Sequence, residues 1–134
     1  MASRINRPRT AFSLDPSDKT QRRIEDPAHL AFIRTLPSVI SGETGCQACH
    51  LRAGNPSYRK KRTGARQKPD DSWTLPMTIL EHRQQHHENE IEFYRRHGIQ
   101  DPWALCLALY EVTGNRDAAV AIIIKFRRRK SGHG

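Results

Sequence analysis

The clearest periodic pattern in the first half of the chain is a set of apolar residues at helical spacing. Its members are Leu30, Phe32, Ile33 and Leu36. Apolar side chains three or four positions apart lie on one face of a helix. Asp26 and Pro27 supply an N-cap and a proline at the first helical position, and Pro37 ends the pattern. The sequence therefore predicts a helix between these signals, with one face buried.

Start and stop signals predict further helices in the second half of the chain. Thr78 and Glu81 form a capping-box pattern, so a helix should begin directly after Thr78. A second helix is expected within 89–98, a third is capped by Asp101, and the apolar run 118–126 predicts a fourth. The expected core consists of Leu30, Ile33, Leu36, Phe93, Leu105, Leu109 and residues 122–124.

Between these helices the pattern predicts a strand or hairpin around 46–52 and a long loop over 53–71 that is rich in Gly, Pro, Arg and Lys. Loops of this length in a small domain usually carry a function or are disordered. We interpret 1–25 as a basic flexible arm, 26–126 as the single folded domain and 127–134 as a basic disordered tail.

Composition adds a partner class to this picture. The formal net charge is +9 and the sequence pI is near 10.1, which suits a polyanionic partner such as DNA, RNA or an anionic membrane. No apolar run is long enough to span a bilayer, and the N-terminus lacks the apolar stretch of a signal peptide. The sequence therefore predicts a soluble, cytoplasmic protein without a membrane partner. In that setting the three cysteines are expected to be thiols or metal ligands.

The candidate chemistry lies in three short segments. His82 and His86 are four residues apart, so a helix places both on one face where they can bind one ion. Asp71, with Asp70 as the alternative, adds a carboxylate, and His50 at an expected strand end can serve as a general base. A base with one bound divalent ion is the layout of a one-metal phosphodiesterase. Magnesium or manganese is the expected ion, with zinc as the alternative.

Two cysteines support a competing interpretation. Cys46 and Cys49 have Cys-x-x-Cys spacing, and with His82 and His86 they match the ligand types of a structural zinc site. The stretch between Cys49 and His82 is far longer than the roughly 12 to 15 residues of a zinc finger. A closed four-ligand zinc leaves no position open for catalysis, so this interpretation makes the protein a nucleic-acid-binding module.

Basic residues gather in the long loop between the two halves of the candidate site. A loop that follows the phosphate backbone would carry such a run, although many charge runs are only solvated surface. The predicted nucleic-acid-binding residues are Arg52, Arg59, Lys60, Lys61, Arg62 and Lys68.

Taken together, several short motifs resemble a known family. They are Leu36-Pro37, Cys49-His50-Leu51-Arg52, Lys68-Pro69-Asp70-Asp71, Leu75-Pro76 and His82-x-x-x-His86, followed by Phe93 and Gly98. The run from His29 to Gly98, about half of the chain, is similar to the phage- and prophage-associated branch of the His-Me finger (HNH) endonucleases. That branch is related to the recombination-enhancing nuclease Ref.

The resemblance implies an α+β, mainly helical domain in which a ββα-metal core is packed by additional helices. It implies metal-dependent cleavage of DNA, with His50 as the general base. His82 and His86 would be metal ligands, and Asp71 would complete or orient the site. It further implies a recombinase filament as a partner. The remaining alternatives are a non-catalytic, zinc-stabilised nucleic-acid-binding protein and a basic structural protein of a phage or prophage.

The sequence also departs from the family pattern. The family usually carries additional Cys and His residues that bind a structural zinc. The corresponding positions here are Ser38, Ser41, Thr78 and Glu81. All four have lost a thiolate or imidazole, which is the pattern expected when a structural metal is abandoned as a unit.

Overall fold

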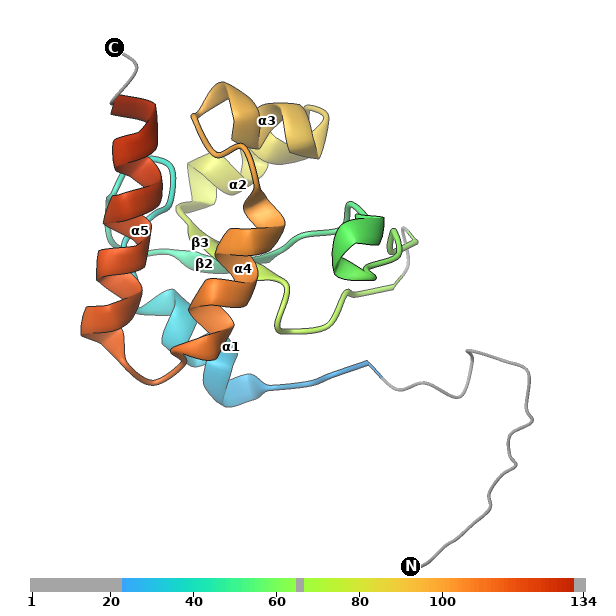
Figure 1. The fold of residues 1–134 in the computed structure, drawn as a ribbon, viewed down its shortest axis with the longest axis horizontal. Helices are drawn as coiled ribbons and strands as arrows, with labels where there is room; N and C mark the ends of the chain where they lie inside the picture. Colours follow the sequence, from blue (N-terminus) through green and yellow to red (C-terminus); the bar gives the residue numbers. More distant parts are fainter. Residues whose placement is uncertain (1–22, 65–66, 132–134) are drawn as a thin grey trace, which may run out of the picture.

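A computed structural model describes residues 23–64 and 67–131, and this part of the chain is a mixed α+β fold that is mainly helical (Figure 1). Helix α1 (Pro27–Arg34) precedes the two antiparallel strands β2 (Gln47–His50) and β3 (Thr74–Met77). The sheet is followed by helices α2 (Ile79–His86), α3 (Glu90–Arg96), α4 (Pro102–Glu111) and α5 (Arg116–Ser131). The expected α+β class is confirmed; a ββα-metal core stays a prediction.

Helix α1 begins where the sequence predicts, and its N-terminus is tied to the second half of the chain. Oδ1 of Asp26 accepts a hydrogen bond from the backbone N–H of His29 at 3.0 Å, and its Oδ2 accepts one from the Tyr110 hydroxyl at 3.1 Å. The buried His29 ring is hydrogen-bonded through Nδ1 to Oγ1 of Thr113 at 2.8 Å. The start of α1 is therefore fixed against α4 and the turn that follows it.

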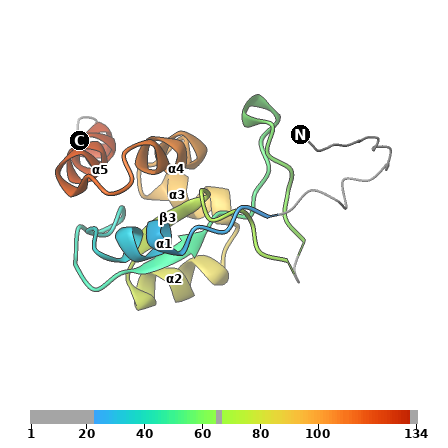
Figure 2. The same cartoon turned by 90° about the horizontal axis from the view of Figure 1, so that it is seen from below.

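The two strands form the centre of the fold. Antiparallel pairing sets Gln47 opposite Met77 and His50 opposite Thr74. Strand β3 is buried along its whole length because helices cover it: α1 and α4 both contact it, and Figure 2 shows α4 and α5 on one side of the sheet and α2 on the other. Pro76 has no N–H to donate, and its carbonyl accepts from the backbone N–H of Val39 at 3.0 Å.

The helix signals in the sequence are confirmed, with one difference in length. Thr78 and Glu81 form the predicted capping box at the start of α2, and the Asp101 side chain caps α4. Helix α5 continues to Ser131, beyond the expected end at Phe126, so the predicted disordered tail 127–134 starts inside a helix. Residues 132–134 lie outside the described part. None of the described helices has the length and apolar character needed to cross a membrane.

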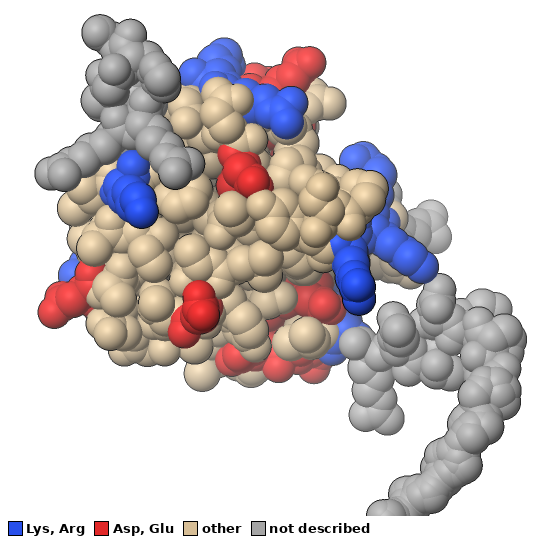
Figure 3. All heavy atoms as spheres, in the orientation of Figure 1, with Lys and Arg blue, Asp and Glu red and all other residues tan. Residues whose placement is uncertain are grey.

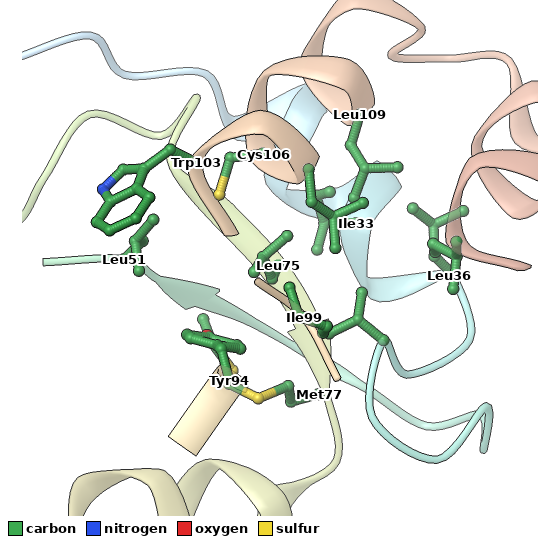
Figure 4. Packing of buried hydrophobic residues seen from close by; sticks show 14 of the residues in the cluster. Ile33, Leu36, Leu51, Leu75, Met77, Tyr94, Ile99, Trp103, Cys106 and Leu109 are labelled. Carbon is green, nitrogen blue, oxygen red and sulfur yellow. The ribbon is translucent and has the colours of Figure 1, made fainter. Parts of the chain in front are cut away.

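The core contains most of the predicted residues together with others, and Leu30, Ile122 and Ile124 of the predicted set are not fully buried. Ile33, Leu36, Leu75, Tyr94 and Leu109 are among the side chains that meet between the sheet and the helices (Figure 4). The expected core residues Phe93, Leu105 and Ile123 are also buried. Leu30 is only half-buried, and Ile124 is 42% exposed because α5 packs on α4 with one face.

The long loop is partly organised, and it projects from the body of the molecule (Figure 1). Asn55 and Lys60 form an antiparallel bridge around a short 3-10 helix, Pro56–Tyr58. A side chain at Gly54 would place its Cβ only 2.6 Å from the backbone nitrogen of Arg62, so the close approach of these two loop segments requires glycine. The Tyr58 hydroxyl donates to Oδ2 of Asp101 at 2.6 Å and holds the loop against the start of α4.

Candidate active site

His50 is the last residue of β2, as expected for a strand-end histidine. Its side chain is 19% exposed, and its Nε2 lies 2.9 Å from Oδ1 of Asp71. The sheet creates this contact, because pairing places His50 opposite Thr74, and Oγ1 of Thr74 donates to the carbonyl of Asp71 at 2.9 Å. The register of two strands thus brings together two predicted site residues from separate motifs.

The carboxylate of Asp71 is 4% exposed and has three hydrogen-bond donors. Oδ1 accepts from Nη1 of Arg23 at 2.9 Å as well as from His50, and Oδ2 accepts from the backbone N–H of Asp26 at 2.8 Å. Burial opposes ionisation, but the hydrogen bonds from His50 and Asp26 and the charge of Arg23 lower the pKa of Asp71. This carboxylate is therefore ionised and accepts hydrogen bonds at neutral pH.

An ionised Asp71 determines which nitrogen of His50 carries the proton. A carboxylate cannot donate, so Nε2 of His50 must be the protonated nitrogen in the neutral ring. Nδ1 is then unprotonated, and no described residue donates a hydrogen bond to it. An imidazole oriented by a carboxylate, with its second nitrogen free to accept a proton, is the arrangement of a general base.

The second group of predicted site residues is the histidine pair, His82 and His86, on one face of α2. Their Nε2 atoms are 3.0 Å apart, and their ring centroids are separated by 4.6 Å. Nδ1 of His82 lies 2.8 Å from Oε1 of Gln47 on β2. Because an amide oxygen only accepts, Gln47 holds the proton on Nδ1 of His82 and leaves its Nε2 as a lone-pair nitrogen.

The electrostatics of the histidine pair favour this neutral form. Burial lowers the pKa of His82, and repulsion from His86 and from His50 lowers it further. Metal ligands must be unprotonated at the coordinating nitrogen, so the state of His82 is the one that a metal requires. The charge of His50 contributes to the lowered pKa of His82, so these two histidines lie within electrostatic range of each other.

The distance between the two Nε2 atoms of the histidine pair matches the distance between two nitrogens that bind the same metal ion. Two nitrogens that bind a metal at about 2.1 Å lie roughly 3.0 to 3.4 Å apart, and the observed separation is 3.0 Å. Asp71 does not join them, because its oxygens are used by His50, Arg23 and Asp26. Over residues 23–64 and 67–131, no three or more His, Cys, Asp or Glu side chains gather into a group that could hold a metal. A bound ion would complete its coordination with water and substrate oxygens.

Asp70, the alternative carboxylate, is also engaged, since its Oδ1 accepts from the backbone N–H of Ile24 at 2.8 Å. The structure therefore divides the predicted constellation into two parts. His50 and Asp71 form one hydrogen-bonded dyad, and the histidine pair forms the other.

Among the described residues, the two cysteines and the histidine pair of the competing interpretation are not gathered into one group of metal ligands. Cys46 and Cys49 are buried, and their thiols donate to the carbonyls of Glu43 and Gln47. Burial and the charge of Glu81 raise the pKa of Cys46 to about 11. Burial and the neighbouring Cys46 raise the pKa of Cys49 to about 12. Neither thiol is gathered with the histidine pair, and in the absence of a metal ion both are protonated at neutral pH.

Four polar residues lie together where α2 begins, and we call them the Glu81 cluster: Ser38, Ser41, Thr78 and Glu81. The family resemblance alone would assign these positions to a structural zinc. Oε1 of Glu81 accepts from the Ser38 hydroxyl at 2.5 Å and from the backbone N–H of Thr78 at 2.9 Å. The Ser38 hydroxyl in turn accepts from the backbone N–H of Ser41 at 3.1 Å. Burial opposes ionisation of Glu81, but hydrogen bonds from Ser38, Ser41 and Thr78 lower its pKa. Hydrogen bonds therefore join the α1–β2 loop to the start of α2.

Arg52 and Lys60, both predicted to bind nucleic acid, make contacts within the protein. Nη1 of Arg52 donates to the carbonyls of Gly64 and Gln67 at 2.8 and 2.7 Å. Lys60 is 7% exposed, its Nζ donates to the Arg52 carbonyl at 3.2 Å, and it lies 5.7 Å from the centre of the Trp73 ring. Burial lowers the pKa of Lys60. The exposed members of the predicted set are Arg59, Lys61, Arg62 and Lys68.

Sequence reasoning missed two residues of the site. Arg23 was assigned to the flexible arm, although its guanidinium contacts Asp71, and Gln47 was assigned no role, although it sets the protonated nitrogen of His82. No signal marks Arg23, because its partner lies 48 residues away along the chain. Gln47 could have been found from the alternation of a strand, which places a polar residue outside the core.

No protein-family model, curated protein or solved structure is detectably similar to this chain. The resemblance to His-Me finger endonucleases accordingly stays a prediction, and the function must be argued from the geometry of the described residues.

Proposed function

We propose that the protein is a metal-dependent nuclease that hydrolyses phosphodiester bonds in DNA. The observation that carries this proposal is the His50–Asp71 dyad at the end of β2, with the histidine pair on the helix that directly follows β3. An oriented base and a pair of adjacent imidazole nitrogens that can bind a metal ion, on a strand–strand–helix unit, are the two groups that such a hydrolysis requires.

In the proposed reaction, a water molecule attacks the phosphorus atom and gives one proton to Nδ1 of His50. The bond between phosphorus and the departing sugar oxygen breaks, and that oxygen takes a proton from a solvent water molecule to become a hydroxyl group. His50 returns its proton to the solvent. The products are a phosphomonoester and a free hydroxyl. Asp71 stabilises the imidazolium that forms on His50, because its ionised Oδ1 is 2.9 Å from Nε2.

His82 and His86 would hold the metal, which when bound supplies positive charge to the phosphate and to the departing oxygen. Because Asp71 does not join the pair, the protein donors are imidazoles. Imidazole nitrogen suits zinc, nickel and iron better than it suits magnesium, which prefers carboxylate and water oxygens. We therefore expect activity at lower concentrations of a transition metal ion than of magnesium, a shift from the sequence-based expectation of magnesium or manganese.

DNA is the proposed substrate because of the charge and its distribution. The net charge is +9, and blue side chains cluster at the edge of the molecule from which the long loop projects (Figure 3). Arg59, Lys61 and Arg62 are exposed there. Cationic side chains on a projecting loop contact backbone phosphates, so they contribute affinity and little sequence preference. A recombinase filament stays a prediction of the family resemblance alone.

The deciding experiment is a plasmid-nicking assay with magnesium, manganese, nickel or zinc, each with and without EDTA. His50→Ala should reduce the rate by roughly a hundredfold or more, since general-base catalysis contributes about 10² to 10⁴. His87→Ala is the matched control, because His87 is exposed and next to the pair. Unchanged cleavage in His50→Ala would remove the base from the mechanism. DNA binding without cleavage in any metal would favour the non-catalytic binding module.

A further inference from the structure

The segment just before α1 is attached to the candidate site by its backbone. The backbone N–H of Ile24 donates to Oδ1 of Asp70 at 2.8 Å, and the carbonyl of Ile24 accepts from the N–H of Asp71 at 2.9 Å. Two residues later the N–H of Asp26 donates to Oδ2 of Asp71 at 2.8 Å. Backbone groups of residues 24–26 thus hold this segment along 70–71, and the Arg23 side chain takes no part in these contacts.

The Arg23 side chain makes a separate contact that anchoring does not require. Its Nη1 lies 2.9 Å from Oδ1 of Asp71, the same oxygen that faces Nε2 of His50. Arg23 is 30% exposed, whereas Asp71 is 4% exposed. A carboxylate buried to this degree is costly unless a charge balances it, and Arg23 is the cation recorded in contact with it among the described residues.

We propose that Arg23 is a positioning residue: it fixes the Asp71 carboxylate in place and thereby holds the proton of His50 on Nε2 and leaves Nδ1 free. The catalytic part of this inference rests on the proposed nuclease function, but the control over the His50 ring does not. Without Arg23, Oδ1 of Asp71 loses the charged donor that keeps it opposite Nε2 of His50. The carboxylate is then free to turn towards other donors, and once its oxygen no longer faces Nε2 the other tautomer of His50 becomes populated.

The tautomer of His50 can be measured directly in the full-length protein by NMR after labelling the histidines with ¹⁵N. We expect wild-type His50 to be protonated at Nε2, Arg23→Gln to show a mixture of tautomers, and Arg23→Lys to restore the wild-type signature because lysine also donates a charged hydrogen bond. Glu25→Gln is the matched control. Glu25 is exposed, and it contacts Nη2 of Arg23 at 2.8 Å, whereas Asp71 contacts Nη1. Thermal unfolding checks that each variant is folded.

Cleavage kinetics provide the second readout. In Arg23→Gln we expect kcat to fall roughly 10- to 100-fold, since misplacing a catalytic group costs factors of this size, with Arg23→Lys close to wild type. A single Nε2-protonated tautomer of His50 in Arg23→Gln would overturn the proposal, as would a change confined to KM. A tautomer change without cleavage in any variant would uphold the positioning role and count against the nuclease function instead.

Discussion

The Glu81 cluster at the start of α2 and the histidine pair further along the same helix differ in how their hydrogen-bonding groups are used. Oε1 of Glu81 has two donors from the protein, and the Ser38 hydroxyl both donates to Glu81 and accepts from backbone N–H groups. In the pair, the two Nε2 atoms of His82 and His86 meet each other at 3.0 Å. The first arrangement is closed and suits stability. The second places the lone pair of His82 Nε2 against Nε2 of His86, a single contact between two imidazoles that a metal ion bound to both nitrogens would replace.

The strongest test of this difference is to remove each histidine. His82→Ala or His86→Ala should weaken binding of a transition metal ion and reduce cleavage by roughly a hundredfold or more, because one of two protein ligands is lost. The free energy of unfolding without metal should change little. Isothermal titration calorimetry and the nicking assay provide the measurements. Unchanged metal affinity in both variants would mean that the 3.0 Å contact is a plain hydrogen bond between two histidines.

The Glu81 cluster should respond in the opposite way. Glu81→Ala removes the acceptor of two hydrogen bonds and half of the capping box, so the free energy of unfolding should fall by about 1 to 3 kcal/mol. Metal affinity should stay at the wild-type value. Urea unfolding monitored by circular dichroism measures the first quantity, with the exposed Glu111→Ala as control. Loss of metal binding in folded Glu81→Ala would show that the two groups are not independent.

A second variant at this position, Glu81→Gln, tests a pH dependence of stability that has a definite sign. The pKa of Glu81 lies below its ordinary value of 4.5 in the folded protein, so folding favours its ionised form. Its contribution to stability is therefore complete above that ordinary value and is lost as pH falls through the folded-state pKa. The stability difference between wild type and Glu81→Gln should shrink over this acidic range.

The proposed DNA contacts of the projecting loop can be tested without changing the Glu81 cluster or the histidine pair. Replacing Arg59, Lys61 and Arg62 by glutamine should reduce the dependence of log K on log salt by up to roughly three units, because each lost phosphate contact contributes about 0.9. Metal affinity and stability should be retained. A matched variant with equal net charge replaces the exposed Arg34, Arg95 and Lys125. Equal salt slopes in the two variants, measured by fluorescence anisotropy, would assign the loop charges to solvation.

The smallest expected effect is that of the Glu81 charge on the pKa of Cys46. Burial is the main reason that the pKa of Cys46 is about 11, and the charge of Glu81 adds to it. Thiol labelling at pH 8 should be slow, since little thiolate is present, and should accelerate as pH rises towards that value. Glu81→Gln should shift the midpoint slightly downward. Fast labelling of Cys46 at pH 8 in the folded wild type would contradict the buried, protonated state.

The helices were predictable from sequence because their signals are local. The Asp26 cap, the Thr78–Glu81 capping box and the Asp101 cap all act within three or four residues, and each is present in the structure. Strand β3 offered no comparable signal. It is buried on both faces, so it lacks alternation, and it contains Pro76, which is unusual in a strand.

The site was predictable in its residue types but not in its grouping. The spacing of His82 and His86 is a local property, and the structure brings them together. Asp71 was expected beside them as a ligand, yet strand register and the segment before α1 place it with His50 and Arg23. Lys60 was expected at the surface, but its contacts with Arg52 and Trp73 bury it. Such contacts depend on tertiary packing, which a single sequence does not display.

The hydrogen bonds at the start of α1 have a consequence for synthesis of the chain on the ribosome. Asp26, whose N–H supports Asp71, is itself held by Tyr110, and His29 is held by Thr113, in each case across 84 residues. At about 5 to 20 residues per second, these partners are translated roughly 4 to 17 seconds after α1. A nascent chain would therefore carry the histidines of the site well before Asp71 is fully supported. The His50–Asp71 dyad should therefore be completed only late in the synthesis of the chain.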